Sequence, residues 1–175
     1  SMGTAVIQNY VRQFGTEKLA SAVFVDQSPM FFTEEGWDYP LMGDFDGVAL
    51  AELIQNFRYN RERAAKPFIR AMFADPPEDD VVDDMYAETM KTPTDVAVSA
   101  VGDMSYQDLR PVLSDVDVPV LLLYGEQSAI FPGDPGAWLA SELPEAEHVP
   151  FEESGHCPFW EEPEKFNEQI AAFVG

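Results

Sequence analysis

Cysteine and histidine are both scarce in this sequence of 175 residues. The single cysteine, Cys157, excludes an internal disulfide framework and fits a reducing compartment. Only His148 and His156 could join it as metal ligands, so cysteine and histidine cannot assemble a zinc site. We therefore expect neither a metal nor another cofactor.

Basic residues are scarce as well. The chain has 10 lysines and arginines against 32 aspartates and glutamates, which gives a net charge of −22. Such a surface repels polyanions, which argues against nucleic acid and anionic membranes as partners. Because the acidic residues are spread along the whole chain, and salt would screen their repulsion, we expect a halophilic protein. An acidic cytoplasmic protein without that adaptation is the alternative.

Long apolar runs are absent. The longest candidate for a buried strand, residues 118–124, is far shorter than the ~20 apolar residues of a membrane-spanning helix. The N-terminal residues lack the basic and apolar regions of a signal peptide. We therefore expect a cytoplasmic location.

Helical and strand patterns alternate at both ends of the chain. Apolar residues at helical spacing predict a helix over 5–14, and a short strand over 19–25 follows. The continuous apolar run at 118–124 is typical of a strand buried on both faces of a parallel sheet. The alternation then continues with a helix over 136–143, a strand over 146–151 and a helix over 163–174. This order predicts an α/β fold, with parallel core strands flanked by helices.

The middle of the chain has a different character. Here aromatic residues and methionines lie among acidic stretches, and further helices are predicted over 48–57, 67–73, 81–90, after Pro93 and over 105–113. We therefore divide the chain into a core part at residues 1–29, a helical part at 30–104 and a second core part at 105–175.

A histidine motif lies in the loop predicted between the last strand and the last helix. His156 is part of Gly155-His156-Cys157-Pro158, and such loops beyond parallel strands commonly carry active sites. Together with Leu-Leu-Leu-Tyr-Gly at 121–125 and Pro-Glu-Lys-Phe at 163–166, this motif resembles the C-terminal end of an α/β-hydrolase. The resemblance implies that His156 is the general base of a catalytic triad and that residues 30–104 form a mainly helical cap. A structural histidine bonded to the backbone is the alternative.

The start of the chain extends the resemblance. Ser1-Met2-Gly3, followed by a helix, resembles the nucleophile elbow of this family from its serine onward. This implies that Ser1 is the nucleophile and that the backbone N–H of Met2 is a donor of the oxyanion hole. The sequence matches only the C-terminal part of the fold, because the core strands that precede the elbow are not in it. Alternatively, Ser1-Met2 is the remnant of a cleaved purification tag.

The acid of the triad has three candidates. Gly125-Glu126-Gln127-Ser128 has a serine where many relatives carry the acid. This departure resembles family members whose acid follows the preceding strand, which implies Asp26, with Glu126 and then Asp134 as alternatives. A purely structural role in the turn is also open for Asp26.

Two functions follow from the resemblance. The first is hydrolysis of an ester-like carbonyl compound by a triad of Ser1, His156 and Asp26 that is incomplete in this truncated chain. The substrate class is a small apolar ester, and side chains of residues 30–104 line an apolar pocket. Aromatic and methionine side chains at helical spacing, however, more often form a core. The second is a non-catalytic module that associates through the open edge of its sheet, either as a homo-oligomer or with a separate N-terminal fragment.

Overall fold

A parallel sheet of three strands organises the protein. The structure, a computed structural model, describes residues 1–175. The strands are β1 (Ala22–Val25), β2 (Val120–Gly125) and β3 (Ala146–Phe151), in the spatial order β1-β2-β3. The register places Val25 beside Leu123 and Leu123 beside Val149. Because the strands are parallel, their carboxyl ends meet at one edge of the sheet.

Helices cover both faces of this sheet, so every residue of β2 is buried. On one face, Phe24 and Leu122 pack in a cluster with Ala5 and Leu139. On the other face, Leu121 and Leu123 pack against the C-terminal helix. The covering helices are α1 (Met2–Phe14), α6 (Pro135–Glu142) and α8 (Pro163–Val174). This explains why the β2 sequence is apolar without alternation, as predicted.

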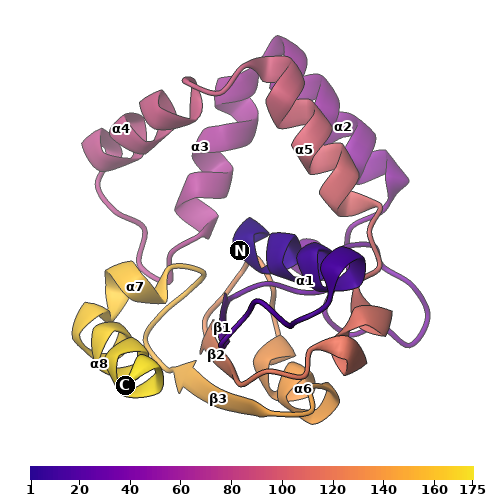
Figure 1. Ribbon diagram of the computed structural model, residues 1–175. Helices are drawn as coiled ribbons and strands as arrows, with labels where there is room; N and C mark the ends of the chain where they lie inside the picture. The colour runs from indigo at the N-terminus through magenta and orange to yellow at the C-terminus, as the bar shows by residue number, and fades with distance from the viewer.

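Between β1 and β2 the chain forms a helical segment. It comprises the short 3₁₀ turn η1 (Leu41–Gly43) and the helices α2 (Gly47–Tyr59), α3 (Arg61–Ala71), α4 (Asp79–Thr89) and α5 (Thr94–Ser105). The Asp46 carboxylate caps α2 by accepting hydrogen bonds from the N–H groups of Val48 and Ala49. Helix α2 packs on α5 and helix α3 on α4, so the segment arches over the sheet and α1 (Figure 1).

The predicted helix over 105–113 is wrong. Helix α5 ends at Ser105, and a 3₁₀ turn, η2 (Arg110–Asp115), takes up part of the remaining residues. Between them, Asp108 forms an isolated bridge with Met30, and the N–H of Leu109 donates to the carbonyl of Pro29. These contacts with a distant segment replace the local bonds of a helix.

Two further differences concern short elements. The first strand begins at Ala22 rather than at Leu19, and the helix α7 (Pro158–Glu161), directly after the histidine motif, has no counterpart among the predictions. The predicted strand over 146–151 and the closing helix over 163–174 are confirmed. No helix of the protein combines the length and the apolar character that crossing a membrane requires.

Candidate active site

Asp26 and His156 meet at the carboxyl edge of the sheet. Asp26 follows β1 directly and His156 lies in the loop after β3; both are buried. The His156 Nδ1 lies 3.7 Å from the Asp26 Oδ1, somewhat beyond hydrogen-bond distance. Neither carboxylate oxygen of Asp26 nor the His156 Nδ1 has another hydrogen-bond partner. If the two side chains moved slightly closer, the His156 imidazole and the Asp26 carboxylate would form a hydrogen-bonded pair in a buried site.

The backbone at Asp26 is strained. Its φ of 37° lies in the left-handed region, which aspartate tolerates better than most residues but still at a cost. This sharp turn directly after β1 aims the carboxylate along the sheet edge towards the loop of His156. Strain of this kind is commonly found at functional sites.

Two glycines let the histidine loop approach its neighbours. A Cβ atom built on Gly125 would lie 1.9 Å from the carbonyl oxygen of Gly155, so a side chain there is excluded. A Cβ on Gly155 would lie 2.8–2.9 Å from backbone atoms of residues 72–74. In this close packing the N–H of His156 donates a hydrogen bond of 2.7 Å to the carbonyl of Met72. The end of α3 thereby fixes the position of His156.

Two glutamates from α7 and its end hold the same loop. Glu161 accepts hydrogen bonds from the N–H of Gly155 at 2.8 Å and from the N–H of Ala74 at 2.7 Å. Glu162 accepts bonds from the hydroxyl of Ser154 at 2.6 Å and from the N–H of Glu153 at 3.1 Å. Glu161 thus ties the histidine loop to the segment after α3, and Glu162 stiffens the loop itself.

Ser1 lies beside this pair at the N-terminus of α1. Its backbone nitrogen donates a hydrogen bond of 2.5 Å to the carbonyl of Val25, the residue before Asp26. The Ser1 hydroxyl donates to the Gln27 Oε1 at 3.3 Å and makes no hydrogen bond with His156. The Ser1 hydroxyl is thus bonded to Gln27 rather than to His156.

Met2 is the first residue of α1. At this position the backbone N–H has no partner within the helix, because a helix leaves its first N–H groups free. The helix dipole adds partial positive charge at the same end. Met2 thus offers a donor beside Ser1.

The two alternative acids lie away from His156. Glu126 is exposed after β2. Asp134 caps α6 and lies 3.6 Å from the Nε2 of the other histidine, His148. Of the three candidate acids, Asp26 is the one beside His156.

The thiol of Cys157 follows His156 directly. It is buried, and burial together with the nearby carboxylates of Glu161 and Asp26 raises its pKa to about 12. A thiol with this pKa stays protonated at neutral pH and is a poor nucleophile.

An apolar cavity of about 300 Å³ extends from Ser1 beneath the helical segment. Thirteen of its 17 lining residues are hydrophobic. One face of α3 and the residue after it contribute Arg61, Ala64, Ala65, Phe68, Ile69 and Met72. Phe131, which also lines the cavity, has its ring centre 6.0 Å from that of His156. The cavity therefore connects Ser1 with a compartment suited to a hydrocarbon group, and its lining residue Phe131 lies next to His156.

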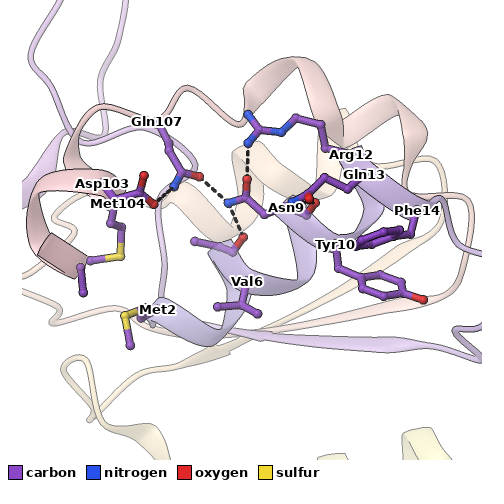
Figure 2. Close-up of a pocket in the computed structure, with 12 residues that line it drawn as sticks. Met2, Val6, Asn9, Tyr10, Arg12, Gln13, Phe14, Asp103, Met104 and Gln107 are labelled. Carbon is purple, nitrogen blue, oxygen red and sulfur yellow. Dashed lines mark hydrogen bonds between the residues drawn. The ribbon is translucent and has the colours of Figure 1, made fainter. Parts of the chain in front are cut away.

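A second, open groove of about 610 Å³ runs along α1. Its floor carries Met2, Val6, Tyr10 and Phe14, which follow one another at a spacing of four residues on one side of the helix (Figure 2). On the far wall, the side chains of Asn9 and Gln107 are hydrogen-bonded and tie α1 to the turn after α5. This groove does not contain the serine and the histidine.

Comparisons with known proteins agree with this architecture. A family model described as the alpha/beta hydrolase fold matches residues 1–163. The chain belongs to the α/β-hydrolase fold family. The fold class expected from the histidine and serine motifs is therefore confirmed.

Several relatives in this family are esterases. The esterase EaEST from Exiguobacterium antarcticum superposes with a TM-score of 0.89 at 21% identity, over 99% of this chain and 64% of its own. A putative aryl esterase from Burkholderia cenocepacia gives a TM-score of 0.78 at 30% identity, over 99% of this chain and 61% of its own. The pimeloyl-[acyl-carrier protein] methyl ester esterase of Aromatoleum aromaticum is 25% identical, over 94% of this chain and 67% of its own. The chain thus spans about two thirds of the length of these α/β-hydrolases.

Sequence reasoning missed the residues that hold the site together. Glu161, Glu162 and Gln27 were not singled out, and nothing in the motif indicates that the carbonyl of Met72 receives the histidine loop. The one available signal is the position of the glutamates, because a carboxylate five or six residues after His156 can fold back onto the loop at the start of a helix.

Proposed function

We propose that this site hydrolyses esters with an apolar acyl group. The Ser1 Oγ attacks the carbonyl carbon while His156 takes the hydroxyl proton. The carbon–oxygen bond to the alcohol then breaks, and His156 gives the proton to the leaving alcohol. Water, deprotonated by His156, then attacks the acyl carbon, the carbon–oxygen bond to Ser1 breaks, and His156 returns the proton to the Ser1 Oγ as the acid leaves.

Each neighbouring group has a role in this mechanism. Asp26 holds the imidazole in one orientation and stabilises its protonated form. The N–H of Met2 donates to the oxygen that becomes negative when the carbonyl is attacked. Because the Ser1 hydroxyl is bonded to Gln27 in the free protein, substrate binding has to release it; such catalytic bonds commonly tighten only in the complex. We assign residues 30–104 as a cap that covers the acyl group.

The observation that carries the proposal is the combination of a buried imidazole–carboxylate pair with an apolar cavity that begins at Ser1. The relatives support the same reaction class, since they are named as esterases from three bacteria.

Hydrolysis of p-nitrophenyl hexanoate tests the proposal. We expect Ser1→Ala and His156→Ala to abolish turnover, and Asp26→Asn to lower kcat by orders of magnitude. Glu126→Gln, which removes an exposed carboxylate from the neighbouring strand end, is the matched control and should keep wild-type kcat. Circular dichroism reports whether each variant is folded. Wild-type turnover in folded His156→Ala, or a larger loss in Glu126→Gln than in Asp26→Asn, would contradict the assignment.

Self-association is the second candidate function. The exposed row of Met2, Val6 and Phe14 on α1, together with the free edge of β1, is the observation that favours it. An apolar strip and an unpaired strand edge both invite a second copy of the chain. Since each copy carries a charge of −22, the association should tighten as salt rises. Sedimentation velocity over a range of salt concentrations tests it, and a monomer at every concentration would rule it out.

A further inference from the structure

Arg61 is a buried cation without a carboxylate partner. It is 9% exposed and lies at the start of α3, where it lines the apolar cavity. Although the chain has 32 acidic residues, Arg61 takes part in no ion pair. Its neighbour inside the cavity is the ring of Phe57, 5.6 Å away. Buried charges in proteins are generally paired, because leaving water is costly.

The contacts of Arg61 with the backbone neutralise this charge only in part. Its Nη1 donates to the carbonyl of Thr92 and its Nη2 to that of Thr89, both at 2.6 Å. These carbonyls lie at and just beyond the C-terminal end of α4, where the helix dipole is negative, so they orient the guanidinium. The Nε remains buried without any hydrogen-bond partner. A purely structural anchor would leave a whole positive charge facing a hydrocarbon cavity.

Helix α3 sets the distance between Arg61 and the candidate catalytic residues, because Arg61 lies at its start and His156 is bonded to the residue after its end. At the other end of the helix face, the carbonyl of Met72 holds the N–H of His156, and Ser1 adjoins the same edge through Val25. Met72 is eleven positions after Arg61, which at the helical rise corresponds to about 16 Å. Arg61 and Met72 both line the cavity, so their side chains shorten the span that a ligand has to bridge between the two ends of α3. A cavity of about 300 Å³ holds on the order of ten atoms, at about 30 Å³ each.

We propose that Arg61 binds a carboxylate at the far end of the acyl group. The preferred substrates are then monoesters of medium-chain dicarboxylic acids, with the ester at Ser1, the hydrocarbon along α3 and the free carboxylate at the guanidinium. This assignment rests on the proposed esterase function for the position of the ester. The pairing of guanidinium and carboxylate is the strongest hydrogen-bonding arrangement open to arginine.

Binding of molecules that cannot be hydrolysed tests Arg61 independently of catalysis. The probes are the N-methyl monoamides of hexanedioic, octanedioic and decanedioic acid, in which the amide stands in for the ester. Each is compared by isothermal titration calorimetry with the analogue whose free carboxylate is replaced by a primary amide. In the wild-type protein we expect the carboxylate of the best-fitting length to bind at least about tenfold more tightly than its neutral analogue.

Variants of two arginines on α3 separate recognition from stability. Arg61→Gln should lower the affinity ratio to one or below, because the remaining charge of the protein repels a carboxylate. Arg61→Lys keeps the charge and should retain part of the ratio. Arg63→Gln removes an exposed arginine on the same helix and should leave the ratio unchanged. Since the two probes are compared within one variant, a general loss of stability does not alter the ratio.

The outcomes distinguish this inference from the proposed function. A ratio near one in the wild-type protein, a ratio that persists in Arg61→Gln, or no binding of either probe overturns the role of Arg61. If Arg61→Gln does not fold, the wild-type ratio and that of Arg61→Lys decide. Turnover of p-nitrophenyl hexanoate without the carboxylate preference refutes the role of Arg61 alone. A preference without turnover refutes the esterase and leaves the carboxylate site.

Discussion

Glu161 should be the residue that fixes the histidine loop, and a single isosteric change tests this. In Glu161→Gln one carboxylate oxygen becomes an NH₂ group, so either Gly155 or Ala74 then faces a donor instead of an acceptor. The other bond persists without its negative charge. The loss is therefore one charge-assisted hydrogen bond and part of a second, or about 2–4 kcal/mol in the free energy of unfolding.

Chemical denaturation followed by circular dichroism measures this loss, with Glu168→Gln as the control. Glu168 is an exposed residue of α8 whose side chain makes no hydrogen bond or ion pair, so its replacement should change stability by less than about 0.5 kcal/mol. Hydrogen exchange gives the local readout, because the N–H of His156, now protected by the carbonyl of Met72, should exchange faster in Glu161→Gln.

Equal unfolding curves for the two variants, together with unchanged exchange at His156, would refute this reasoning. That result would mean that the close packing around the two glycines, rather than the carboxylate, holds the loop.

Three further predictions concern packing, the thiol and charge. Gly125→Ala should destabilise the protein by at least about 1–3 kcal/mol, since its Cβ would meet the Gly155 carbonyl, whereas Gly102→Ala, in an open helical position, should be neutral or stabilising by denaturant titration. Cys157, whose pKa is raised to about 12, should stay a neutral thiol from pH 6 to pH 9, so the folded protein should react with iodoacetamide far more slowly than the unfolded chain; equal rates would contradict its burial. The melting temperature should rise between 0.1 M and 1 M NaCl, where the screening length falls from about 10 Å to about 3 Å; a constant value would argue against the halophilic interpretation.

Local patterns were enough to predict the strands and most helices. The run at β2 is apolar because both faces of that strand are covered, so its sequence reports its burial directly. The segment after Ser105 was misjudged because its conformation depends on Met30 and Pro29, about 80 residues away, and no local pattern contains that information.

The part of the candidate site that lies at the ends of strands was predictable. Asp26 and His156 each follow a parallel strand, and parallel strands bring such residues to one edge. The contacts that orient them were not predictable, because Met72 acts through a backbone carbonyl, which every residue has. The role of Arg61 was not predictable for another reason. The sequence Asn-Arg-Glu-Arg at the start of the helix is typical of a solvent-exposed segment, and it does not indicate that the first arginine lines a cavity.

The connection between β1 and β2 has a consequence for how the protein folds. Strand β1 pairs with a partner separated from it by residues 26–119, so this pairing closes a very long loop and is slow. The contacts of α2 with α5 and of α3 with α4 lie within the helical segment and need no such closure. During refolding, helix content should therefore return first, while the edge of β2 that pairs with β1 stays open and is prone to aggregate. Asp26 and His156 come together only when the sheet closes, so the site is assembled in the last step.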